Sequence, residues 1–231
     1  MAAMRMDLAT MAPGAASGNA AAGLRGRRAF LGFGAIALAL LSLGVGMAAL
    51  ETALGLADLP HPLAMLDARL PIVFRIHMLA GALGLMLLPV ALALRGVPWL
   101  HRRLGRAAAT LLLVAALAGL PSALASEASW PARLGFLAQG ACCAACVAFA
   151  WRAIRRRDAA AHARHMARAA AIVSGVIWLR LAVGTAVALQ LPFDASYAAI
   201  AWASWLVPLM VVWLWSGAAQ RRRHPHPHRT G

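Results

Sequence analysis

The sequence predicts an all-α, polytopic membrane protein with six transmembrane helices, of which spans two to five form a four-helix bundle. The prediction rests on composition, on the length of the apolar stretches and on the placement of the arginines. The chain has 231 residues, of which 62% are hydrophobic and 13% charged, and its mean hydropathy is +0.73. Soluble domains carry about 25% charged residues, so this composition excludes an ordinary soluble fold.

Six apolar stretches are long enough to cross the roughly 30 Å of hydrocarbon in a bilayer, which takes about 20 helical residues. Strands are excluded, because an open sheet leaves its backbone unpaired in lipid and barrel strands would alternate polar and apolar residues. The second span is interrupted near its start by Arg75 and His77, and Pro121 is expected to kink the third. The expected spans are Ala29–Leu50, Pro71–Leu94, Ala107–Ser126, Leu134–Trp151, Ala169–Leu191 and Ala195–Ser216.

The chain divides into three predicted parts. Residues 1–28, rich in Ala, Gly, Ser and Met ahead of the first span, are expected to be a disordered cytoplasmic leader. Residues 29–216 form the transmembrane domain. Residues 217–231 form a basic, histidine-rich cytoplasmic tail that we expect to lie on anionic lipid, although its histidines could also chelate a metal.

Arginine placement predicts the orientation. All 22 basic residues are arginine and the formal net charge is +15. The leader, the loops after spans two and four and the tail carry most of them, so the positive-inside rule places both termini in the cytoplasm. The lysine-free, Ala- and Leu-rich composition suggests a GC-rich bacterial genome and hence a bacterial inner membrane. Because the basic residues alternate with membrane-length apolar runs, the partner expected from the charge is the lipid bilayer and no nucleic acid.

Three polar side chains fall at a similar depth in three spans. At a rise of 1.5 Å per residue, Arg180 should lie roughly 12 Å and His77 roughly 9 Å from the outer face, with Gln139 at a similar level. An arginine that deep costs at least about 2.5 kcal/mol and is seldom left facing lipid. The sequence therefore predicts an interior polar site of His77, Gln139 and Arg180, with a purely structural hydrogen-bond network as the alternative.

Two histidines mark the cytoplasmic edge. His101 lies at the start of the third helix, and His162 precedes the fifth span, with His165 one turn further on. Imidazoles that face each other from different helices can ligate one b-type haem. His101 and His162 are therefore the candidate haem ligands. The outer level offers only His77, so a second haem lacks a ligand. The competing interpretation is that these histidines contact phosphates at the interface.

Five short motifs between His77 and Arg180 follow one another in a characteristic order. They read IHMLAGALG at Ile76–Gly84, LHRRLGR at Leu100–Arg106, LGF at Leu134–Phe136, HARHMAR at His162–Arg168 and LR at Leu179–Arg180. In this order they resemble an uncharacterised bacterial integral-membrane family, the domain of unknown function DUF2306, over a core of about residues 70–190. His165 departs from the family pattern, which has another bulky residue there. The resemblance implies an architecture, loosely similar to cytochrome b561 and ferric-reductase bundles, and no activity.

Two functions from different classes follow. The first is a b-type haem electron-transfer protein, with a quinone or a redox protein as partner. The alternative is a non-enzymatic membrane protein whose polar network is structural or binds a lipid or small ligand. No catalytic residue is predicted, because the chain lacks a phosphate-binding loop, a Ser-His-Asp arrangement and paired intramembrane carboxylates. Cys142, Cys143 and Cys146 could hold copper, but their small neighbours are more typical of close helix packing.

Overall fold

We describe a computed structural model in which the backbone is defined for residues 14–223 and the side chains for residues 32–216. All of the regular secondary structure in the described chain is helical, and this part of the chain contains no strand. Six of its helices, all but the short α2, are long and apolar enough to cross a membrane, which confirms the predicted fold class. The elements are α1 (Gly14–Ala53), α2 (His61–Arg69), α3 (Pro71–Ala93), the 3-10 turn η1 (Leu94–Gly96), α4 (Pro98–Ala125), α5 (Trp130–Arg155), α6 (Ala159–Ala188) and α7 (Phe193–Arg223).

Most helices extend beyond the apolar stretches that predict them. Asp158 caps α6 by accepting the Ala161 N–H at 2.8 Å, so α6 begins at Ala159 rather than at Ala169. Hydropathy detects only the part of a helix inside the bilayer, whereas capping and helix propensity continue it into the basic segments. α1 begins inside the expected leader, residues 1–28, and α7 continues into the expected tail, residues 217–231. Residues 1–13 and 224–231 lie outside the described residues.

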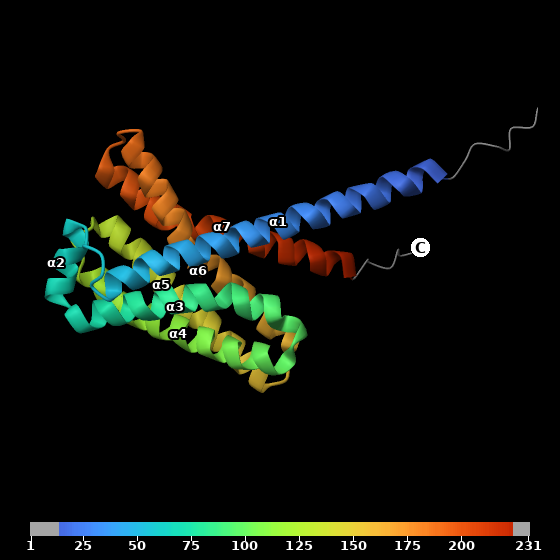
Figure 1. Cartoon of the computed structure of the whole chain (residues 1–231), viewed down its shortest axis with the longest axis horizontal. Helices are drawn as coiled ribbons and strands as arrows, with labels where there is room; N and C mark the ends of the chain where they lie inside the picture. The colour runs from blue at the N-terminus through green and yellow to red at the C-terminus, as the bar shows by residue number, and fades with distance from the viewer. Residues whose placement is uncertain (1–13, 224–231) are drawn as a thin grey trace, which may run out of the picture. The chain divides into compact units, whose positions relative to one another are not determined.

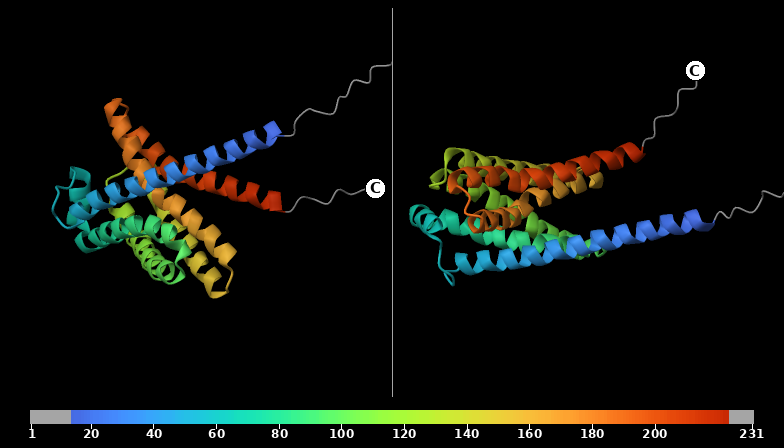
Figure 2. Two further views of the ribbon diagram at one scale, coloured as in Figure 1. Left: turned by 45° about the vertical axis from the view of Figure 1, so that its right-hand side comes forward. Right: turned by 90° about the horizontal axis from the view of Figure 1, so that it is seen from above.

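The chain forms two compact units, residues 1–40 and residues 41–231. The first unit contains the N-terminal part of α1. In the second unit α3 packs against α4, α4 against α5, α5 against α6 and α6 against α7 (Figure 1; Figure 2). One cluster joins Leu88, Leu112, Val147 and Ala169 from α3, α4, α5 and α6, so these helices form the predicted four-helix bundle.

A second cluster extends the core to α7. It consists of Ala116, Cys143, Ile172 and Trp205, one residue from each of the four helices α4 to α7. The indole N–H of Trp202 also donates to the Pro131 carbonyl of α5 at 3.0 Å. α7 therefore packs on both α5 and α6 and belongs to the core of the second unit.

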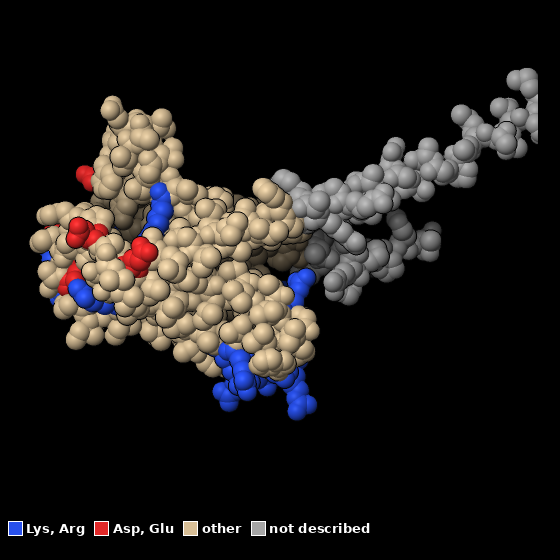
Figure 3. Space-filling model, viewed as in Figure 1, with Lys and Arg blue, Asp and Glu red and all other residues tan. Residues whose placement is uncertain are grey.

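Charge is segregated between the two ends of the second unit. Figure 3 shows the acidic side chains of one face near α2, and most of the arginines at the opposite end. Two of the arginines at the acidic end are paired with carboxylates: Arg75 donates to Asp67 at 3.0 and 2.8 Å, and Arg69 to Glu127 at 2.7 Å. Arg133 instead donates to the main-chain carbonyls of Ala128 and Leu124 at 2.7 and 3.2 Å. These two ion pairs tie α2, which the sequence analysis did not predict, to α3 and to the loop after α4.

Candidate functional site

Three histidines make the same kind of hydrogen bond. In each, the ring Nδ1 lies within hydrogen-bonding distance of a main-chain carbonyl on the neighbouring helix, and because a carbonyl only accepts, Nδ1 is the donor. Each bond ties two consecutive long helices together. The pairs are His77 with Ala115 (2.8 Å), His101 with Ala91 (2.8 Å) and His162 with Ala150 (3.0 Å).

Two glycines make room for interior polar side chains. A Cβ added at Gly119 of α4 would lie 2.9 Å from Nδ1 and Cε1 of His77, so the imidazole occupies the space that this glycine leaves. A Cβ added at Gly175 of α6 would lie 2.8 Å from Nε2 of Gln139. The glycines thus let these side chains approach the backbone of the neighbouring helix.

The side chains expected at one interior site bond to three different helices. His77 reaches α4, Gln139 donates to the Ile172 carbonyl of α6 at 3.1 Å, and Arg180 donates to the Val45 carbonyl of α1 at 3.3 Å. Within the described side chains, no hydrogen bond or ion pair joins His77, Gln139 and Arg180 to one another. Arg180 is also exposed rather than enclosed by the bundle.

His101 and His162 stand on helices that are not direct neighbours. α4 packs against α3 and α5, whereas α6 packs mainly against α5 and α7. The bond of His101 to Ala91 directs its Nδ1 toward α3, and that of His162 to Ala150 directs its Nδ1 toward α5. Each ring therefore has a fixed orientation and one nitrogen without a hydrogen bond in the described chain.

A groove of about 500 Å³ lies between α5, α6 and α7. α5 and α7 line it with stripes at the same helical spacing, i, i+3, i+4 and i+7, which place each set on one helix face. Ile172 of α6 is only 1% exposed. The lining residues are Cys142, Ala145, Cys146 and Phe149 of α5, His165, Arg168 and Ile172 of α6, and Leu206, Leu209, Met210 and Trp213 of α7.

Two polar side chains of α6 enter this otherwise apolar groove. The His165 ring lies against Phe149, with ring centroids 5.5 Å apart, and its buried Nδ1 has no hydrogen-bond partner. Arg168, three residues further along α6, is half-buried and has no ion pair or hydrogen bond within the described chain. Neither residue is among the predicted site residues: His165 departs from the family pattern, and Arg168 resembles the other arginines of its basic loop. The matching i, i+3, i+4 and i+7 stripes of α5 and α7 are the feature of the sequence that could have indicated the groove.

The cysteines divide between the core and the groove. Cys143 is buried in the cluster with Trp205, as the packing interpretation expects. Cys142 is exposed and Cys146 half-buried, and both line the groove. Within the described residues no cluster of three or more His, Cys, Asp or Glu side chains could hold a metal ion.

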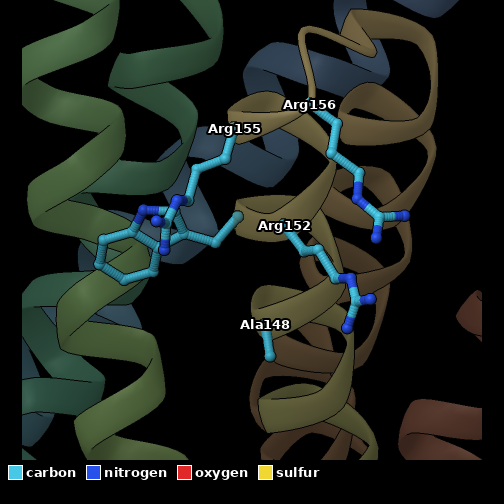
Figure 4. A pocket seen from close by; sticks show the side chains of 5 residues that line it. Ala148, Arg152, Arg155 and Arg156 are labelled. Atoms are coloured by element: carbon cyan, nitrogen blue, oxygen red, sulfur yellow. The ribbon is translucent and has the colours of Figure 1, made fainter.

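A second depression, of about 640 Å³, lies at the C-terminal end of α5. Figure 4 shows that Arg152 and Arg156 extend to the same side of the helix, while Arg155 extends to the other. Ala148 and Trp151 complete its lining. This surface is strongly basic and adjoins the groove along α5, since Arg152 and Arg156 continue the stripe of Phe149 at i+3 and i+7.

The fold and these sites define a polytopic helical membrane protein. The chain belongs to the family of predicted membrane proteins with domain of unknown function DUF2306, whose family model matches residues 74–216. The match covers most of α3, all of α4, α5 and α6, and the membrane-spanning part of α7, so it includes every groove residue. No curated protein and no solved structure matches the chain.

Proposed function

We propose that this protein is a non-catalytic, multi-pass membrane protein that binds a membrane-derived amphiphile in the groove between α5, α6 and α7. One observation carries the proposal: an apolar groove holds a buried imidazole nitrogen without a partner and an arginine without a counter-ion. An unsatisfied buried polar group costs about 1–3 kcal/mol. Ionisable residues inside membrane helices commonly mark ligand pathways.

The hydrogen bonds of the interior polar residues favour a structural role, in which these side chains hold neighbouring helices together. His77, His101 and His162 each bond to a carbonyl of an adjacent helix, as Gln139 and Arg180 do on other helices. Hydrogen bonds across helices are a recognised source of stability in lipid. This pattern supports the structural interpretation of His77, Gln139 and Arg180, and it leaves the groove as the place for a ligand.

The proposed location is a bacterial inner membrane, with both termini in the cytoplasm. The support is the segregation of charge, since the loop η1 and the loop after α5 lie at the arginine-rich end. The positive-inside rule assigns such an end to the cytoplasm. In this orientation His165 and Arg168 lie at the cytoplasmic edge of the bilayer, just before the predicted fifth span.

Filling the groove tests the proposal. Ala145→Trp places an indole on the groove face of α5, whereas Ala141→Trp adds the same bulk at an exposed position that does not line the groove. After purification in mild detergent, native mass spectrometry should find a bound amphiphile on the wild type and on Ala141→Trp but not on Ala145→Trp. Identical bound species on all three proteins would overturn the proposal.

A second candidate function is electron transfer by one b-type haem, with a quinone or redox protein as partner. It is favoured by His101 and His162, because a haem-ligating imidazole commonly donates Nδ1–H to a carbonyl and uses Nε2 for the metal. Haem would supply one-electron redox chemistry when bound. The reduced absorption spectrum of protein from haem-replete cells decides the matter. A b-type alpha band that His101→Ala and His162→Ala abolish, and His165→Ala keeps, supports this candidate; absence of the band removes it.

A further inference from the structure

We infer that the amphiphile in the groove is an anionic phospholipid, with its phosphate paired to Arg168 and an acyl chain lying along the apolar stripes of α5 and α7. The inference rests on the proposed function and adds the chemical class of the ligand. It depends on the charge of Arg168, on the unpartnered nitrogen of His165 and on the apolar length of the groove.

Arg168 has no counter-ion among the described residues. α6 is apolar enough to cross a membrane, and Arg168 lies on its groove face beside Cys146. Asp158, the N-cap residue that precedes α6, lies ten residues away and accepts the Ala161 N–H. The other described acidic residues belong to the end of the second unit that carries α2. Within the described residues no acidic side chain is placed to neutralise Arg168, so we assign this role to an external anion.

His165 lies next to Arg168 on the groove face of α6. Residues three apart on a helix are neighbours on its surface, so His165 and Arg168 present one imidazole and one guanidinium to the same part of the groove. The Nδ1 of His165 is buried and has no partner, and Phe149 holds the ring from the side of α5. A phosphate oxygen can accept a charge-assisted hydrogen bond from Arg168, and the imidazole of His165 adds a second polar side chain to the same part of the groove.

The apolar surface of the groove favours a lipid over a free phosphate as the ligand. The α5 stripe from Cys142 to Phe149 covers seven residue steps and extends about 10 Å along the helix axis, and Leu206, Met210 and Trp213 face it from α7. A free phosphate would leave this apolar surface uncovered, whereas an acyl chain covers it. Beyond Phe149, Arg152 and Arg156 extend to one side of α5 (Figure 4), where they add positive charge near the headgroup.

The test measures lipid selectivity of the full chain. Wild-type protein is reconstituted in vesicles of equimolar phosphatidylglycerol and phosphatidylcholine with matched acyl chains and is then extracted in mild detergent. Native mass spectrometry identifies and quantifies the lipid that stays bound. Both lipids offer a phosphate to Arg168, but the choline cation of phosphatidylcholine is repelled by the neighbouring arginines, so we expect phosphatidylglycerol to exceed phosphatidylcholine about tenfold, which corresponds to about 1.4 kcal/mol. Arg168→Gln should abolish this preference. Arg102→Gln, which removes the same charge from an exposed site on α4, should keep it.

Two results would overturn the inference while leaving the proposed function intact. One is equal retention of the two lipids by the wild type, which needs no variant and so does not depend on how Arg168→Gln folds. The other is displacement of the retained lipid by excess inorganic phosphate, which would point to a soluble anion. If Arg168→Gln does not fold, Arg168→Lys keeps the cation and should preserve the preference for phosphatidylglycerol. Failure of Ala145→Trp to release any lipid would instead overturn the proposed function.

Discussion

The imidazole of His165 lies against the ring of Phe149, with the centroids 5.5 Å apart, and its buried Nδ1 has no hydrogen-bond partner. His162, one turn earlier on the same helix, donates to the Ala150 carbonyl at 3.0 Å. Two histidines three residues apart thus have opposite hydrogen-bonding states. The satisfied one ties α6 to α5, and the unsatisfied one faces the groove.

This contrast predicts opposite effects of the same substitution. His165→Phe removes an unsatisfied polar atom and keeps the aromatic contact with Phe149, so the delipidated protein should gain about 1 kcal/mol of stability. His162→Phe loses an interhelical hydrogen bond and should lose about 1 kcal/mol. Thermal unfolding of both variants in detergent measures the difference. Destabilisation by His165→Phe equal to that by His162→Phe would show that Nδ1 is satisfied in the protein.

Gly119 and Gly81 form a matched pair at the contact between α3 and α4. A Cβ at Gly119 would lie 2.9 Å from the ring of His77, whereas a Cβ at Gly81 would meet only the Ala115 Cβ at 3.8 Å. Gly119→Ala should therefore cost about 1–3 kcal/mol through overpacking and loss of the His77 bond, and Gly81→Ala should be nearly neutral. The free energy of unfolding in a detergent titration distinguishes them. Equal tolerance of both substitutions would exclude the tight fit of His77 against Gly119.

The ion pair between Asp67 and Arg75 predicts a dependence of stability on pH. The hydrogen bonds that Arg75 donates, together with its charge, lower the pKa of Asp67 below its ordinary value, against a smaller opposing effect of burial. A depressed carboxylate pKa stabilises the folded state above the pKa of the unfolded chain, and this stabilisation disappears as the pH falls through the folded pKa. Asp67→Asn should thus lower the unfolding temperature at neutral pH, and the difference should close on acidification to below about pH 4. A difference that persists in acid would assign the effect to packing.

Fusions to a reporter enzyme that is active only in the periplasm test the orientation. A fusion at Asp158, in the loop after α5, should be inactive because the arginines at this end keep it in the cytoplasm. A fusion at Glu127, in the loop after α4, should be active. The reverse pattern of activity would show that the protein has the opposite orientation, with Arg168 on the periplasmic side of the membrane.

The fold class was predictable because hydropathy and charge belong to local stretches of sequence. The prolines that open α4 and α5 and the Asp158 cap of α6 are also visible in the sequence. Hydropathy does not take such helix starts into account, so most of the helices are longer than the predicted spans. α2 escaped prediction because its nine residues are too few and too polar to register as a span.

The sequence can predict how deep a site residue lies in the membrane, but not toward which neighbouring helix its side chain is turned. The rise per residue placed His77, Gln139 and Arg180 at similar predicted depths, but it says nothing about which neighbour each helix faces. The structure directs them to α4, α6 and α1, and it turns His165 and Arg168 toward a groove whose other walls are α5 and α7.

The sequence by itself determined that this chain forms six membrane-length helices with its arginines gathered at one end, because the bilayer selects on apolar length and on loop charge. Only the tertiary structure decided which polar side chains are satisfied and which are left for a ligand. That outcome depends on how each helix is rotated and packed against its neighbours, and glycines such as Gly119 and Gly175 control this packing through contacts between residues distant in the chain.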